Sequence, residues 1–241
     1  MTPQQAAHDI AAVVLAAPAG FMTAPETFAR GTELGFDGMD FYVAGRGGVL
    51  GDVPADVATA SFWVFAADTV RPMWDRAGAV MSRRDAAVAW SAVGHDWARN
   101  HWRQGPDFAR AAMLLGRVVH DAPVAGTPIF AGARLLPEPE DAVALAQHRL
   151  NLLRELRGAL HGAALLTVGL SPLEAVVVRA PDNAELFGWT PPFPEPEPFR
   201  ERWALAEART DRMVGRHMAV LDGETLDELV GIVHEIGESV A

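Results

Sequence analysis

Three residues in one segment could form the walls and the polar end of a ligand pocket. Trp90 and Trp97 are seven positions apart, and His101 follows four positions later. These intervals place side chains on one face of a helix. In such a pocket His101 would be a polar handle for the ligand or a base. The alternative is an aromatic core stripe whose terminal histidine bonds to the backbone.

A second candidate site is the glycine-rich stretch 35–52, which contains Arg46 and Tyr42, the single tyrosine of the chain. The planar guanidinium of Arg46 could bind a carboxylate or phosphate through two hydrogen bonds, and Tyr42 could donate a third. In the alternative, Arg46 forms a structural ion pair with Asp37 or Asp40. The stretch is not a phosphate-binding loop, because no Lys-Ser or Lys-Thr pair follows its glycines. The glycines instead indicate tight turns between helices.

Metal ligands are not apparent in the sequence. The chain has no cysteine, no His-Glu-x-x-His motif, and eight scattered histidines. His120, His148 and His161 could meet only through tertiary folding. We therefore predict no metal site and no cofactor.

The composition restricts the class of protein. Half of the 241 residues are hydrophobic, which predicts a folded chain with a sizeable core. The net charge is −11 and every basic residue is arginine, so DNA is not an expected partner. No run of 18 uncharged apolar residues and no signal-peptide pattern is present, which predicts a cytoplasmic protein without membrane contact. We expect a monomer or a homodimer.

Helical periodicity dominates the chain, and no segment is a confident strand, although Val176–Val178 is β-branched. The prediction is an all-α fold, with a proline-rich linker at 191–198. Gly158 and Gly162 are four apart in the longest helix, a spacing that would let another helix lie close. The predicted helices cover 3–17, 24–34, 39–44, 54–63, 68–74, 83–102, 107–121, 128–136, 139–168, 171–179, 199–220 and 224–239, with caps at Thr2, Thr23, Asp68, Ser82 and Ser171.

A faint internal repeat suggests two halves. Arg30-Gly31 recurs as Arg157-Gly158, and Phe62-Trp63 falls near Phe187-Gly188-Trp189 after a similar interval. We predict an N-terminal half over 1–136 and a C-terminal half over 137–241. The alternatives are a chance alignment and one compact domain.

Three segments, 35–52, 153–165 and 210–212, resemble in the same order a family of uncharacterised actinobacterial proteins that carry a divergent helix-turn-helix label. Its members look like degenerate MarR-type winged helices, and some are encoded near antibiotic-biosynthesis genes. Where members read His-Arg-Gly-Asp-Gly-His, this chain matches only at Arg157, Gly158 and His161. The resemblance implies tandem winged-helix-like halves with little or no strand. The segment after Trp189 is shorter than in the family, so a DNA-reading second half is not expected.

Together these observations predict an intracellular protein that binds an unidentified small molecule on a degenerate winged-helix scaffold, in actinobacterial specialised metabolism. Whether it is an enzyme stays open. The ligand-binding residues would be Arg46, Phe41, Trp90, Trp97 and Arg157, and the candidate catalytic residues are His101, His161 and Tyr42. The alternatives are a MarR-like, DNA-binding transcription regulator and a structural or interaction protein.

Overall fold

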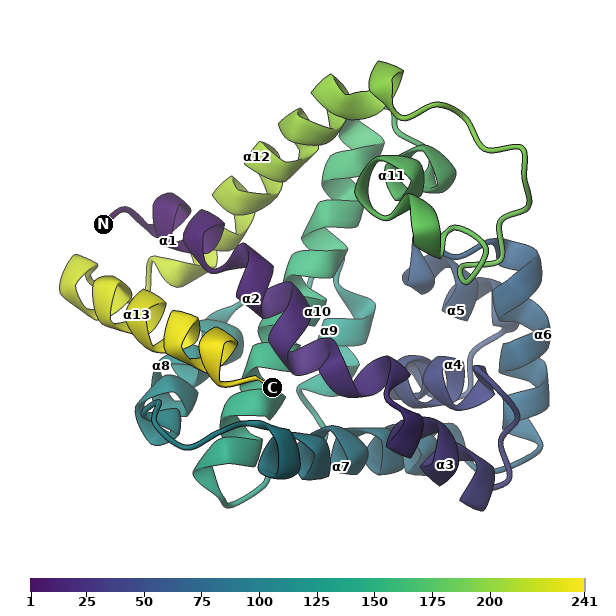
Figure 1. Ribbon diagram of the computed structural model, residues 1–241, viewed down its shortest axis with the longest axis horizontal. Helices are drawn as coiled ribbons and strands as arrows, with labels where there is room; N and C mark the ends of the chain where they lie inside the picture. The colour runs from purple at the N-terminus through teal and green to yellow at the C-terminus, as the bar shows by residue number, and fades with distance from the viewer. Residues whose placement is uncertain (241) are drawn as a thin grey trace.

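The computed structural model describes residues 1–240. Ala241, the last residue of the predicted C-terminal half, lies outside the described residues. In that range the regular secondary structure is helical, with no strand beyond an isolated antiparallel bridge between Trp102 and Val240 (Figure 1). The all-α prediction is confirmed. The elements are α1 (Pro3–Asp9), α2 (Ala11–Ala16), η1 (Ala17–Thr23), α3 (Pro25–Glu33), α4 (Asp40–Gly47), η2 (Gly48–Leu50), α5 (Ala55–Phe62), α6 (Ala67–Gly78), α7 (Arg83–His101), α8 (Phe108–Asp121), α9 (Pro128–Ala133), α10 (Ala142–Thr167), α11 (Pro172–Arg179), η3 (Pro181–Asn183), η4 (Glu197–Phe199), α12 (Arg200–Met218) and α13 (Gly223–Ser239).

Three of the five predicted helix caps are confirmed, at Thr2, Ser82 and Ser171. The Ser82 hydroxyl accepts a hydrogen bond from the Asp85 backbone N–H, and Ser171 forms a capping box with Glu174. Two predicted caps are wrong. The cap of α3 is Ala24, because Pro25 takes the first helical position, and the cap of α6 is Ala66, which leaves Asp68 in the first turn.

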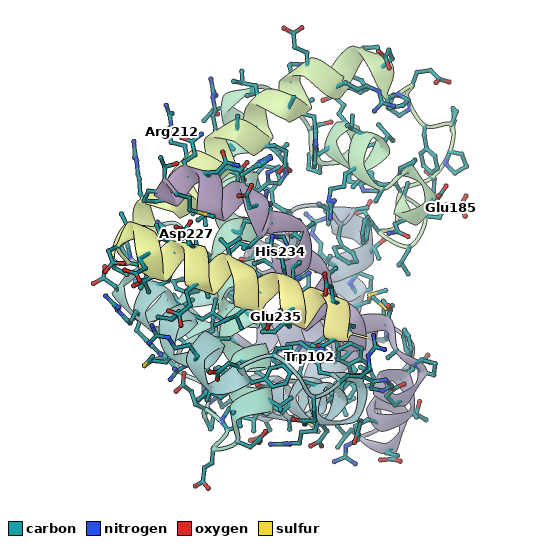
Figure 2. The ribbon with its side chains drawn as sticks, turned by 60° about the vertical axis from the view of Figure 1, so that its left-hand side comes forward. Trp102, Glu185, Arg212, Asp227, His234 and Glu235 are labelled. Atoms are coloured by element: carbon teal, nitrogen blue, oxygen red, sulfur yellow. The ribbon has the colours of Figure 1, made fainter. Side chains whose placement is uncertain are left out.

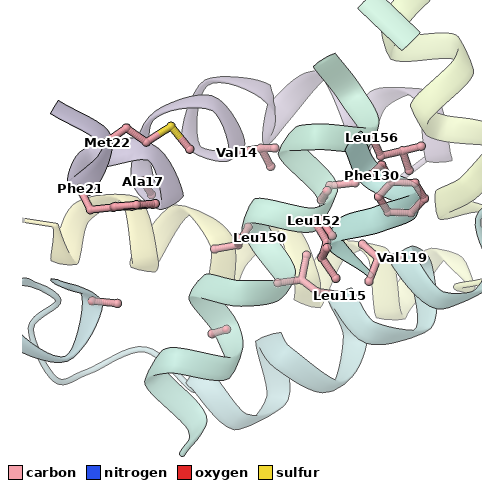
Figure 3. Packing of buried hydrophobic residues seen from close by; sticks show 14 of the residues in the cluster. Val14, Ala17, Phe21, Met22, Leu115, Val119, Phe130, Leu150, Leu152 and Leu156 are labelled. Carbon is pink, nitrogen blue, oxygen red and sulfur yellow. The ribbon is translucent and has the colours of Figure 1, made fainter. Parts of the chain in front are cut away.

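The longest helix, α10, runs through the middle of the molecule (Figure 1). Its flanks contact α7, α8 and α9 from the first part of the chain and α12 from the last part. Leucines recur on several sides of α10, and this explains why its apolar pattern is broad rather than a single stripe. Figure 3 shows three of these leucines, Leu150, Leu152 and Leu156. They belong to one core with side chains from other elements, among them Val14, Phe21, Leu115, Val119 and Phe130.

The first and the last helix of the described chain pack together on one side of the molecule. α1 packs between α12 and α13, and the terminal amine of Met1 lies 3.0 Å from a carboxylate oxygen of Asp227. At the other end of α13, the Arg103 backbone N–H donates to the carbonyl of Ser239 (3.1 Å). Figure 2 shows Trp102 beside this end of α13. The final helix therefore covers the junction between α7 and α8.

The glycine-rich stretch is more helical than predicted. Residues 40–47 form α4, and only Gly35, Gly38 and Gly51 have the positive φ that turns require. The glycines inside α4 serve close packing instead. A Cβ on Gly47 would lie 2.9 Å from both Phe62 and Trp74, and one on Gly45 would collide with Trp90 of α7. The stretch is thus a helix that needs small residues to lie against its neighbours.

Two other expectations have different outcomes. Gly158 and Gly162 do not admit a second helix: a Cβ on Gly162 would meet the indole of Trp63, and one on Gly158 would meet nothing within 4 Å. The tandem winged-helix arrangement and the division at residue 136 stay predictions.

Among residues 1–240, no single helix has the length and apolar composition of a membrane span. Two sharply bent pairs of helices, α1 with α2–η1 and α10 with α11, have that length and composition when each pair is taken together.

Candidate functional site

An open cleft of about 790 Å³ lies beside the second half of α10. Its lining residues come mainly from η1, α4, α5, α10 and α11, together with the segment 126–129 and Trp203 of α12. Most of the lining is apolar or aromatic. The polar and charged side chains that line it are few: Thr23, Tyr42, Arg46, Ser61, Arg154, Glu155, His161, Arg179 and Asn183.

The floor of the cleft holds a glutamate bound by two arginines. Arg46 donates from Nε and Nη2 to the two carboxylate oxygens of Glu155, each at 2.9 Å, and Arg154 donates from Nη1 at 2.7 Å. Arg46 also donates to the Tyr42 hydroxyl at 3.4 Å. The Glu155 side chain is 4 % exposed, and the Arg46 and Arg154 side chains are 15 % and 18 % exposed. Two parallel hydrogen bonds fix the guanidinium plane of Arg46 relative to the carboxylate plane of Glu155. They are strong because both groups are charged.

Burial and charge act in opposite directions on Glu155. Burial alone would raise the pKa of this carboxyl, but the charges of Arg46 and Arg154 outweigh burial and hold the pKa below its usual range. Glu155 is therefore ionised at neutral pH. Arg46 does form a structural ion pair, as one alternative predicted, but not with Asp37 or Asp40. Asp40 is instead bound by Arg76 at 2.7 and 2.9 Å.

His161 lines the cleft two turns after Arg154. Its Nδ1 lies 3.0 Å from the hydroxyl of Thr210, and that hydroxyl donates its proton to the carbonyl of Ala206. Nδ1 must therefore carry the ring proton, which leaves Nε2 as an acceptor. Nε2 is buried and has no partner among residues 1–240. Burial lowers the pKa of His161 to about 4, so the ring is neutral at pH 7.

Arg157 lies on a different side of α10 and does not line the cleft. It is 3 % exposed and donates from Nη2 to Glu207 at 2.5 Å and to Asp211 at 3.4 Å. Asp211 also bonds to His8 of α1 at 2.9 Å, and this bond raises the pKa of His8. Arg157 thus joins α10 to α12, and Asp211 joins α12 to α1.

The expected aromatic wall is part of the core. Trp90 packs against Phe41 with ring centroids 5.2 Å apart, and neither residue lines the cleft. Trp97 stacks on His101 at 4.9 Å near Gly20, and His101 bonds to Glu26 at 2.8 Å on the surface. The structure brings Tyr42, Arg46 and His161 to the cleft and keeps the other predicted residues away from it.

The three histidines considered as metal ligands do not meet. His148 lies 3.1 Å from His95, His120 bonds to Glu138, and His161 is in the cleft. Burial lowers the pKa of both His95 and His148 to about 4. Within residues 1–240, no group of three or more histidine or carboxylate side chains is arranged to hold a metal ion.

Sequence reasoning missed Arg154 and Glu155, which form the charged floor. The available signal was two adjacent charges inside the longest helix, on a face that also contains Gly158 and His161. Five aromatic residues of the cleft were missed as well: Phe62, Trp63, Phe65, Phe187 and Trp203. The first three lie at or just after the end of α5, where Trp63 has a positive φ of 50°.

Comparison with known proteins gives one result. The sequence profile of a helix-turn-helix family matches residues 7–197, which is most of the chain. The chain belongs to this helix-turn-helix family. Neither the curated proteins nor the solved structures contain a significant match. Every residue that lines the cleft except Trp203 lies inside the region matched by the helix-turn-helix family, whereas α12 and α13 follow it.

Proposed function

We propose that the protein binds a small, largely apolar molecule in the cleft beside α10. The observation that carries the proposal is the volume of about 790 Å³ with mostly aromatic and aliphatic walls. Ligand sites in proteins occupy about 300–1,000 Å³ and combine apolar walls with a few fixed polar groups. The cleft has this character, since Tyr42, Arg46 and His161 are the kind of polar groups that orient a ligand.

The resemblance to proteins encoded near antibiotic-biosynthesis genes supports a ligand from specialised metabolism. A catalytic role would have to use Tyr42 or His161, because His101 lies outside the cleft. At neutral pH His161 is a neutral imidazole that can accept a proton only at Nε2, and the Tyr42 hydroxyl accepts a hydrogen bond from Arg46. We therefore propose a binding function. Any catalytic function would depend on Tyr42 and His161.

Titration with the neutral fluorophore pyrenebutanol tests the proposal. We expect saturable binding with one probe per chain and a blue-shifted, longer-lived emission, because the probe would leave water for aromatic walls. Unlabelled apolar alcohols should displace the probe. A linear, non-saturating signal would show adsorption to the surface and would end the proposal.

A DNA-binding regulator is the second candidate, and the helix-turn-helix family favours it. The charge distribution weighs against it. The net charge is −11, and ten of the 20 arginines form ion pairs with carboxylates within residues 1–240: Arg30, Arg46, Arg71, Arg76, Arg99, Arg110, Arg149, Arg154, Arg157 and Arg200. These pairs reduce the number of cations that could displace counterions from a duplex.

A mobility-shift assay with the DNA upstream of the gene at low salt separates the two candidates. Specific DNA binding would weaken steeply as salt is added, because neutralised phosphates release counterions. Absence of a shift at micromolar protein would remove the regulator. A shift that pyrenebutanol reverses would instead join the two candidates in a ligand-responsive regulator.

A further inference from the structure

We infer that the ligand of the cleft carries one anionic group, a carboxylate on an apolar skeleton, which binds beside Arg154 at the floor. This inference rests on the proposed binding function and specifies the chemical class of the ligand. It follows from the charges of the cleft, from the hydrogen-bond donors that Arg154 leaves unused, and from the position of both against apolar walls.

The floor has more positive than negative charge. Arg46 and Arg154 share the single carboxylate of Glu155, and Glu155 is the only acidic side chain lining the cleft among the described residues. Arg179 adds a further cation at the exposed edge. His161 adds no charge, because it is neutral at pH 7. The cleft of an acidic protein thus contains two largely buried guanidinium groups against one carboxylate, and a buried charge that is only partly neutralised is costly.

The other buried arginine of α10 has the opposite balance. Arg157, one turn after Arg154, faces both Glu207 and Asp211. On the side of α10 that faces α12, two carboxylates from α12 therefore surround one guanidinium group, whereas on the cleft side Arg46 of α4 and Arg154 share one carboxylate. This contrast identifies the cleft as the place where one negative charge would be accommodated.

Arg154 also has hydrogen-bond donors that no other residue uses. Within residues 1–240 its single hydrogen bond runs from Nη1 to Glu155, and its Nε is buried without a partner. A guanidinium has five N–H donors in a fixed plane, which suits a carboxylate. Glu155 holds the Arg46 fork on its other side, so the floor is rigid before any ligand arrives. Binding would then cost little side-chain entropy.

A matched pair of probes tests the inference. Pyrenebutyrate and pyrenebutanol share their aromatic skeleton and chain length, and at pH 7 they differ in one negative charge. We expect pyrenebutyrate to bind roughly tenfold or more tightly, since charge-assisted hydrogen bonds to a buried guanidinium are strong. Equal affinities would overturn the inference and leave the binding function intact. Binding of neither probe would end both.

The variant Arg154→Gln assigns the preference to the floor. Glu155 keeps its two bonds to Arg46 in this variant, so we expect it to fold. In this variant the preference for pyrenebutyrate over pyrenebutanol should fall until the two probes bind with nearly equal affinity. Arg71→Gln is the matched control, because Arg71 is exposed and lies outside the cleft. A preference that survives Arg154→Gln, or that disappears in Arg71→Gln as well, would contradict the assignment.

Discussion

Arg46 of α4 and Glu155 of α10 are 109 positions apart and face each other through two parallel hydrogen bonds of 2.9 Å. The pair joins the glycine-rich segment to the central helix at the floor of the cleft. Both side chains are largely withdrawn from water, so their charges attract strongly, and each would be unfavourable alone. The pair therefore has a structural role and also shapes the cleft.

Replacing one member of this pair should destabilise the fold. In Arg46→Met, Glu155 keeps its bond to Arg154 but loses the fork that satisfies both oxygens. Breaking a buried pair costs about 3–5 kcal/mol, and the remaining arginine favours the lower value. For a chain of this size, a loss of ~3 kcal/mol lowers Tm by roughly 6–12 °C. Thermal and urea unfolding measure the loss.

Arg71→Met is the control for this experiment. Arg71 pairs with Asp56 and Asp68 on the surface, where its side chain is 44 % exposed. Exposed ion pairs contribute about 0–1 kcal/mol, so Tm should hardly move. If Arg46→Met unfolds at the same temperature as Arg71→Met, the pair with Glu155 has no structural role.

The helices could be predicted from the sequence because their signals are local. Ser82 and Ser171 cap their helices as the spacing of Asp85 and Glu174 indicated, and the apolar periodicity of α10 was visible over its whole length. Periodicity does not reveal which other element covers a given face. It therefore could not distinguish Trp90 as a core residue from Trp90 as a pocket wall.

The site was only partly predictable, because its residues meet through tertiary contacts. Tyr42 and Arg46 were suggested by their glycine-rich surroundings, and both line the cleft. The same glycines were interpreted as turns, although within α4 Gly45 makes room for Trp90, and Gly47 makes room for Phe62 and Trp74. The true partner of Arg46 is separated from it by half the chain, and no pattern near Arg46 indicates Glu155.

The contact between α4 and α7 makes Gly45 sensitive to a single methyl group. A Cβ on Gly45 would overlap the side chain of Trp90, which is 4 % exposed and surrounded by Phe21, Phe41 and Tyr42. We expect Gly45→Ala to reduce the free energy of unfolding by about 1–3 kcal/mol, the range for an overpacked core. Urea denaturation measures this change.

Gly231→Ala is the matched control for Gly45→Ala. Gly231 is exposed within α13 and a Cβ there meets nothing within 4 Å, so alanine should stabilise by about 0.5–1 kcal/mol through helix propensity. The two variants should shift the urea midpoint in opposite directions. A stabilising Gly45→Ala would mean that α4 and α7 are not in close contact.

The buried histidine pair should make the fold sensitive to acid. The folded pKa of His95 and of His148 is about 4, whereas an unfolded histidine titrates near 6.5. Between these values the unfolded chain binds more protons, so stability rises with pH across this window and is lost as pH falls towards 4. From pH 7 to pH 5 each histidine accounts for about 2 kcal/mol of that loss.

The variant His148→Gln isolates this effect. Glutamine does not titrate, so urea unfolding at pH 7 and pH 5 should show a loss smaller by about 2 kcal/mol than in the native chain. His234→Gln is the control, because His234 is exposed on α13 (Figure 2). An unchanged pH dependence in His148→Gln would mean that the pair is accessible to protons in the folded state.

One added side chain should fill part of the cleft. Gly158 of α10 lines the cleft, and a Cβ on it meets nothing within 4 Å, so the leucine of Gly158→Leu would extend into the open volume. Leucine also favours a helix over glycine by about 0.8 kcal/mol, so we expect equal or higher stability together with pyrenebutanol affinity at least about tenfold lower. Gly231→Leu makes the same exchange on α13, away from the cleft, and should gain similar stability without loss of affinity. If both variants bind the probe as the native chain does, the probe occupies some other surface, and the cleft beside α10 is not the binding site.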